Sequence, residues 1–182
     1  MKKFFSVLLS FILVISLAVL TITISIGLPI YIRDFYFAFV KITDLPTISG
    51  YSFEVIETAF NELMDFLILN KEFSTGALKF SEEGKNHFID VKFLFDLNFY
   101  GLIISLSVSL LIGILHRCKV IKIKRLFDLH PMFYSSIIVI LIPLVVGYFC
   151  LVDFDNAFTV FHHIFFPGKE NWMFNPFEDE II

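Results

Sequence analysis

Residues 97–115, LNFYGLIISLSVSLLIGIL, form an apolar run without a single charge, and residues 116–132, HRCKVIKIKRLFDLHPM, follow it with five lysines and arginines. A run of about 20 apolar residues is long enough for a helix to cross the hydrocarbon core of a bilayer. Inside that core the backbone must satisfy its own hydrogen bonds, which favours a helix. These two segments therefore predict a membrane-spanning helix that ends at a basic loop.

Two further apolar runs, residues 4–32 and residues 133–152, predict two more spanning helices. The whole chain has 182 residues and is 57% hydrophobic, with 25 phenylalanines, and a soluble domain of this size could not bury so much apolar surface. A cleaved signal peptide is the alternative for residues 4–32, but the run is too long and lacks a clear A-x-A site. We therefore predict an all-α fold, a polytopic membrane helix bundle with three spans in this chain and an extracytoplasmic helical domain.

The distribution of lysine and arginine predicts the orientation of these spans. Residues 116–132 carry five of them, and Lys2 and Lys3 add two at the amino terminus. Residues 33–96 and 153–182 together carry seven in 94 residues, and they hold 17 of the 18 acids. We therefore expect one multi-pass domain, residues 1–182, in the cytoplasmic membrane. Its amino terminus and the 116–132 loop would be cytoplasmic, and the two acidic regions would face outward.

The outer region between the first two spans has helical patterns. Within residues 51–69, apolar side chains recur at helical spacing on one face, namely Phe53, Ile56, Phe60, Leu63 and Leu67. This face could lie on the outer leaflet or pack against the rest of the outer domain, and the sequence does not separate the two. Further along, Ser81 is a candidate N-cap, with Glu82 and Glu83 in the first turn, so a helix should run from Glu82 into the second span.

Two histidines on the outer side are candidate acid–base groups. His87 shares a helix face with Asp90, whose carboxylate could hold the imidazole and raise its basicity, although a surface histidine beside a surface aspartate is the ordinary alternative. His162 lies in FHHIFFPGKENWMFNP, residues 161–176, at helical spacing from Asp155, whereas His163 points about 100° away.

Other chemistries have weaker support. The sequence contains no GxSxG, HExxH, P-loop or GxGxxG motif. A metal site formed by His87, Asp90 and His162 would lack any HxxxH or HxH pair, so we predict no metal ion. Arg33 is the only extracytoplasmic arginine, and it could donate to a developing oxyanion, but it equally suits the end of the first span. The net charge of −4 gives no sign of a nucleic-acid partner.

Two motifs, SEEGKNHFIDVK at residues 81–92 and FHHIFFPGKENWMFNP at residues 161–176, together resemble the lipoprotein intramolecular transacylases, a family of bacterial integral membrane proteins. The resemblance extends over most of the chain. It implies an enzyme that moves an acyl chain from the sn-2 ester of a diacylglyceryl group to the α-amino group of the N-terminal cysteine, which gives a lyso-form lipoprotein. The implied partners are a diacylated bacterial lipoprotein and membrane lipid, without a cofactor.

The resemblance also implies roles for individual residues. His87 and His162 would be catalytic, and Asp90 would orient His87. Lys92 would help to shape a site lined by Phe161, Phe165, Phe166, Trp172 and Pro176. To these the sequence pattern adds Asp155 and Arg33 as supporting residues.

Four spans are expected for the family, whereas this chain stops at FEDEII, residues 177–182, where the fourth would begin. Either the chain is truncated before its last helix, or the resemblance to the family is only partial. Two other functions remain as alternatives to acyl transfer: a non-catalytic membrane interaction protein that faces the outside, and a lipid hydrolase.

Overall fold

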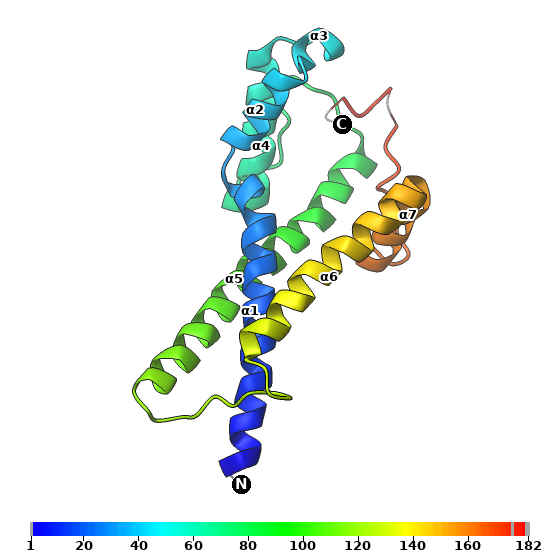
Figure 1. Ribbon diagram of the computed structural model, residues 1–182. Coiled ribbons are helices and arrows are strands. Elements are labelled where there is room, and N and C mark those ends of the chain that lie inside the picture. Colours follow the sequence, from blue (N-terminus) through cyan, green and yellow to red (C-terminus); the bar gives the residue numbers. More distant parts are fainter. Residues whose placement is uncertain (1, 176, 181–182) are drawn as a thin grey trace. The chain divides into compact units, whose positions relative to one another are not determined.

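The computed structural model describes residues 2–175 and 177–180, and these form helices joined by turns and loops, without a strand (Figure 1). In chain order the helices are α1 (Lys2–Tyr31), α2 (Asp34–Ile42), α3 (Leu45–Ser49), α4 (Phe53–Leu69), α5 (Glu82–Arg117), α6 (Pro131–Val152) and α7 (Phe154–Phe165). The all-α class that the sequence predicts is confirmed.

Three helices in the described part of the chain are long and apolar enough to cross a membrane: Phe4–Tyr31 of α1, Glu82–Arg117, which is the whole of α5, and Pro131–Val152, which is the whole of α6. They contain the three apolar runs, apart from the last residue of the first run, so the helices expected there are present. As the capping pattern predicts, α5 begins at Glu82 and continues without interruption through the apolar run (Figure 1).

The sequence predicted a single membrane domain, and the contacts divide the chain into two compact units. The first unit comprises residues 1–27 and 98–158, and the second comprises residues 28–97 and 159–182. Most of α1, the later part of α5 and all of α6 belong to the first unit, which we call the span unit. The second, which we call the outer unit after the orientation expected from the sequence, holds α2, α3, α4, the beginning of α5 and the end of α7.

Small polar residues join α1 to its neighbours in the span unit. Ser16 Oγ donates to Ser105 O of α5 at 3.1 Å. Ser10 Oγ donates to the carbonyl of Lys124, at 2.9 Å, and accepts from its backbone N–H, also at 2.9 Å. Small side chains let helices approach closely in a membrane, where apolar burial supplies little attraction between them. The basic loop is thereby tied to the first span.

The outer unit is built on the apolar face of α4. A buried cluster of Leu63, Met64 and Leu67 forms its core, and partly buried aromatic residues surround it, including Phe60, Phe66, Phe73, Phe88 and Phe95. Ile56, on the same face, is also buried. This face therefore packs against the rest of the outer unit, which answers the question that the sequence left open. Burying each large apolar side chain contributes about 1.5–3 kcal/mol.

Two basic residues hold α4 at different points along its length. Arg33, which lies between α1 and α2, donates to Asn61 Oδ1 at 2.8 Å and forms an ion pair with Asp65. The guanidinium, together with Lys71, holds the pKa of the Asp65 carboxyl below its ordinary value. Lys92 of α5 donates from Nζ to the carbonyls of Phe66 and Leu67 at the carboxyl end of α4, at 2.9 and 3.2 Å. A cation is favourable there because the last carbonyls of a helix carry partial negative charge.

The last described residues fasten onto the beginning of α5. Asp179 is only 3% exposed, and it accepts hydrogen bonds from the backbone N–H of Ser81 at 2.7 Å, from Ser81 Oγ at 3.1 Å and from Asn175 N at 3.1 Å. Ser81 Oγ in turn accepts from Gly84 N at 2.9 Å, so the predicted N-cap is present. A Cβ on Gly84 would overlap the Asp179 carboxylate, which explains the glycine. A carboxylate at a helix amino terminus is also favoured by the helix dipole.

Asp179→Ala should lower the free energy of unfolding of the outer unit by about 1–3 kcal/mol, because the N–H of Ser81 loses its acceptor. Trp172 is the one tryptophan of the chain and lies in the same unit, so its fluorescence on thermal unfolding in detergent can report the change. Glu178→Ala, at an exposed neighbouring position, serves as the control. Equal unfolding temperatures for the two variants would contradict this account of Asp179.

Candidate active site

The outer unit brings His87 of α5 and His162 of α7 together. Their ring centroids lie 5.8 Å apart, and the two residues are only 6% and 7% exposed. His87 follows the cap at Ser81 by six residues, so the cap places it near the beginning of α5. His162 lies in the last turn of α7. Two histidines that are 75 residues apart in sequence thus share one buried site.

Three aromatic side chains enclose the two imidazoles, and we call them the aromatic cage: Phe166, Trp172 and Phe174. The ring of Phe166 lies 5.0 Å from that of His87 and 5.8 Å from that of His162. Trp172 stacks on His162, with a centroid distance of 4.6 Å and an interplanar angle of 28°. Phe174 meets His87 edge-on at 5.3 Å. The sequence pattern missed Phe174, because a phenylalanine among many aromatics carries no signal of its own.

The other aromatic residues expected at the site lie differently. Phe161 and Phe165 contact each other at 4.7 Å on α7, and both are more than 40% exposed. Phe161 also meets His162 edge-on at 5.3 Å. His163 is exposed and meets Trp172 edge-on at 6.1 Å, whereas His162 is buried, as helical spacing suggested. Pro176 lies outside the described residues.

Asp90 does not hold His87 in the way that the sequence suggested. Its carboxylate forms an ion pair with Lys169 and accepts from Asn171 Nδ2 at 2.9 Å. Within the described residues, Nδ1 of His87 has no hydrogen-bond partner. Asp90 therefore anchors the loop that follows α7. It influences the His87 imidazole electrostatically, through its negative charge, and indirectly, through the position of that loop. The physical reason is that Lys169 and Asn171, which local sequence does not place near Asp90, are stronger partners for its oxygens.

Lys92, Arg33 and Asp155, the other expected supporting residues, are held by different parts of the fold. Lys92 binds the end of α4 and Arg33 binds Asn61 and Asp65, so the contacts of both stabilise the outer unit. Asp155 is exposed in the first turn of α7. Direct roles for these three residues in the chemistry stay predictions. Among residues 2–175 and 177–180, no group of three histidine, cysteine or acidic side chains is arranged to hold a metal ion.

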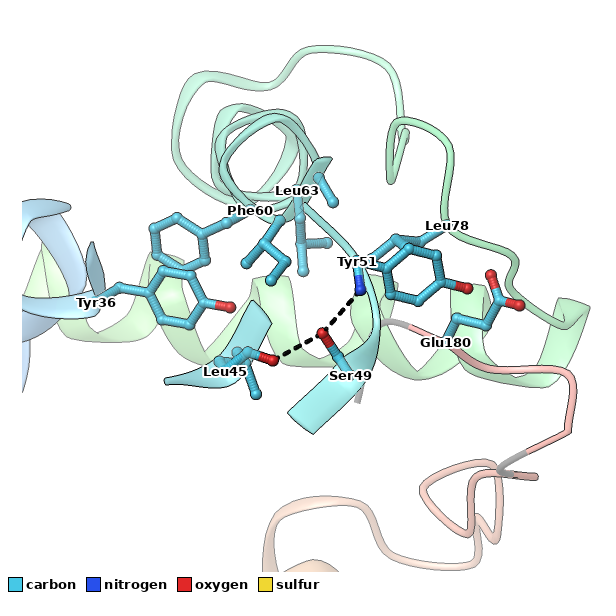
Figure 2. A pocket seen from close by; sticks show the side chains of 10 residues that line it. Tyr36, Leu45, Ser49, Tyr51, Phe60, Leu63, Leu78 and Glu180 are labelled. Carbon is cyan, nitrogen blue, oxygen red and sulfur yellow. Dashed lines mark hydrogen bonds between the residues drawn. The ribbon is translucent and has the colours of Figure 1, made fainter. Parts of the chain in front are cut away.

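A small pocket of the outer unit is separate from the histidine pair. Its volume is about 190 Å³, and neither histidine lines it. Figure 2 shows Tyr36, Phe60 and Leu63 on one part of its wall and Tyr51, Leu78 and Glu180 on another. Ser49 Oγ donates to Leu45 O at 2.8 Å and accepts from Tyr51 N at 3.3 Å, which shapes the loop that closes it. None of the site residues expected from the sequence belongs to this pocket.

Comparison with known proteins places the chain in a family. The profile of the family described as lipoprotein intramolecular transacylase Lit matches residues 11–182. A structure of the membrane-integral lipoprotein intramolecular transacylase Lit from Bacillus cereus superposes with a TM-score of 0.80 at 20% sequence identity, covering 96% of this chain and 78% of that one. Curated protein sequences gave no match.

Two structures of histidine variants of the same Bacillus cereus protein agree with this result. In one a histidine is replaced by arginine and in the other by alanine, and each superposes with a TM-score of 0.77 at 20% identity. They cover 96% of this chain, and this chain covers 75% and 76% of theirs. The structural likeness shows a shared membrane fold, and the profile spans nearly the whole sequence, so this chain belongs to the lipoprotein intramolecular transacylase family, Lit, whose members are acyltransferases.

Proposed function

We propose that the chain moves an acyl chain from the sn-2 ester of a diacylated bacterial lipoprotein to the α-amino group of the same lipid-bearing cysteine, which gives the lyso-form. Family membership supports the type of reaction. The observation that carries the site is the buried pair of His87 and His162, with ring centroids 5.8 Å apart. Two imidazoles at this separation can act in one reaction, one at the amine nitrogen and the other at the ester oxygen.

The reaction is balanced without any further reactant. The amine nitrogen attacks the ester carbonyl, a C–N bond forms and the C–O bond to the glycerol breaks. The nitrogen loses a proton and the glycerol oxygen gains one. Because donor and acceptor belong to one molecule, their effective concentration is already high. The enzyme then has to fold the lipid back, move one proton and stabilise an oxyanion.

The histidine pair suits that proton transfer. Imidazole gains and loses a proton near neutral pH, and general acid–base catalysis by a positioned group contributes about 10²- to 10⁴-fold in rate. One histidine would take the proton from the amine while the other donates to the leaving oxygen or to the oxyanion.

The aromatic cage gives a reason why transfer would prevail over hydrolysis. Phe166, Trp172 and Phe174 surround the imidazoles, and little of either histidine is exposed. Removing water from a reacting ester suppresses its hydrolysis and strengthens the electrostatic interactions inside the site. On the exposed side of α7, Phe161 and Phe165 present apolar rings that acyl chains could cover, as aromatic residues do at a membrane interface.

The proposed location is the outer face of the bacterial cytoplasmic membrane. The excess of lysine and arginine at the amino terminus and in residues 116–132 supports a cytoplasmic position for both. Both histidines belong to the acidic outer regions, residues 33–96 and 153–182, so the site would face outward. A diacylated lipoprotein anchored in the outer leaflet would then reach it without leaving the membrane.

The test is the identity of the product. The purified chain in liposomes is given an equal mixture of two synthetic diacylglyceryl-cysteinyl lipopeptides. One has deuterated acyl chains, and the other has ordinary acyl chains and a different peptide. Mass spectrometry should find products of unchanged mass with one acyl chain on the amino terminus, none at sn-2 and no exchange of label. Loss of one acyl chain as free fatty acid would indicate a hydrolase instead, and absence of conversion would indicate a non-catalytic protein; either result overturns the proposal.

A further inference from the structure

Two buried polar atoms beside the histidine pair lack partners, and they are chemically complementary. Within the described residues, Nδ1 of His87 and Oδ1 of Asn171 are both buried without a hydrogen-bond partner. A neutral imidazole carries a proton on one ring nitrogen, and an amide oxygen only accepts. An unpaired buried donor or acceptor is costly, so such atoms in a folded protein call for an explanation.

The orientation of the Asn171 side chain follows from its other contact. Nδ2 of Asn171 donates to Asp90 Oδ2 at 2.9 Å. A carboxylate that also pairs with Lys169 is an acceptor, so the end of the amide that faces it must be the NH₂ group. The amide oxygen is therefore the end that remains for a second partner.

His87 is the residue from which this amide oxygen can accept a hydrogen bond. Asp90 lies three residues after His87 on α5, so the two side chains share one helix face. The Asn171 side chain lies within interaction range of the His87 ring, although Nδ1 and Oδ1 do not meet the geometry of a formed hydrogen bond. A hydrogen bond between Nδ1 of His87 and Oδ1 of Asn171 would satisfy both of these buried atoms.

We propose that Asn171 is a positioning residue that accepts the Nδ1–H of His87 while it donates to Asp90, so that Nε2 of His87 is left free to accept a proton. The inference rests on the proposed acid–base function of His87. Fixing one tautomer in this way matters because a base with its proton on the wrong nitrogen cannot take another from the substrate.

The same loop also holds the second histidine. Trp172, the next residue, stacks on His162 at 4.6 Å, and its Nε1–H donates to Lys169 O at 2.9 Å. Lys169 is paired with Asp90. Residues 169–172 thus form one unit, anchored on Asp90, that orients His87 by a hydrogen bond and His162 by stacking. Gly168, with φ of +73°, supplies the left-handed turn that leads into this unit.

The tautomer of His87 can be measured without turnover. Nitrogen NMR on the full chain with ¹⁵N-labelled histidine, in detergent at neutral pH, distinguishes the two tautomers, and comparison with His87→Ala assigns the signal. We expect the Nδ1–H form in the native chain and a shift toward Nε2–H in Asn171→Ala. The rate of acyl transfer in Asn171→Ala should fall about tenfold, roughly what one ordinary hydrogen bond supplies.

Asn171→Asp keeps an acceptor for Nδ1–H, but it replaces the donor to Asp90 by a second carboxylate, so it separates the two contacts of Asn171. It should keep the Nδ1–H tautomer and recover part of the rate. The added negative charge stabilises the protonated ring, so the acidic limb of the pH–rate profile should move to higher pH. His162 on α7, Asp90 on α5 and Lys169 on the loop also face His87, and they are unchanged in the variant. Glu170→Gln, an exposed position on the same loop, is the control and should behave as the native chain.

Three results would overturn the inference: an Nε2–H tautomer of His87 in the native chain, a tautomer unaffected by Asn171→Ala, or a changed tautomer with an unchanged rate. Failure of the underlying function is distinguishable, since it would appear as full activity in His87→Ala. The NMR result would still decide whether Asn171 binds His87.

Discussion

Replacing His87 or His162 with alanine is expected to lower kcat for acyl transfer by about 10²- to 10⁴-fold, the range that one general acid or base contributes. Both rings are buried in one site, with centroids 5.8 Å apart, and the proposed reaction requires one proton to leave nitrogen and one to reach oxygen. The measurement is the initial rate of lyso-lipopeptide formation at saturating substrate, with the purified variants in liposomes.

His163→Ala is the matched control for this prediction. His163 is the neighbour of His162 on α7, but it is exposed. Its removal should change kcat by no more than a few-fold and leave the unfolding temperature close to that of the native chain. The rates of all three variants are compared below their own unfolding temperatures, because loss of a buried ring in His87→Ala or His162→Ala also lowers stability. If His163→Ala were as damaging as His162→Ala, the assignment based on burial and helical spacing would be wrong.

Trp172→Ala is expected to have the largest effect on stability, lowering the free energy of unfolding by about 3–5 kcal/mol, as truncation of a buried tryptophan does. Trp172 is 8% exposed, stacks on His162 and donates its indole N–H to Lys169 O. Removing it would open a cavity beside His162 and release the loop that Asp90 anchors. Unfolding followed by calorimetry in detergent measures the loss, because the variant lacks the only tryptophan of the chain.

A second substitution separates the stacking from the hydrogen bond. Trp172→Phe keeps an aromatic face on His162 but removes the indole donor, so it should retain most of the stability and lose activity only moderately. Met173→Ala, at an exposed neighbouring position, is the control. A loss in Trp172→Ala no greater than in Met173→Ala would show that the stacked ring does not support the site.

The membrane helices were predictable because their signal is local. α6 exposes most of its apolar side chains, and it has the length and composition of a membrane-spanning helix, so composition alone predicts it. Ser81 and the two glutamates after it fix the beginning of α5 for the same reason, because capping depends on neighbours in sequence. Helical spacing also separated His162 from His163. These features need no knowledge of the rest of the chain.

The parts that were missed depend on contacts between distant residues. Lys169 pairs with Asp90 across 79 positions, and Asp179 binds Ser81 across 98. No periodicity or motif encodes such pairs. Helices α2 and α3 are short, and the link between them passes through Asp44 in the left-handed region, so residues 33–50 offered no regular pattern. The family resemblance implies that Lys92 helps to shape the site, which stays a prediction, and in the structure Lys92 contacts the last carbonyls of α4, which no local pattern shows.

The central claim is that His87 and His162 act as one catalytic unit, and a double-mutant cycle tests it most directly. Groups that act in a single step have strongly non-additive effects, so removing the second costs little once the first is gone. The measured quantity is kcat for lyso-lipopeptide formation in the native chain, in His87→Ala, in His162→Ala and in the double variant. If the two histidines act as one unit, the double variant should be about as slow as the slower single variant. A loss in the double variant equal to the product of the two single losses would contradict it.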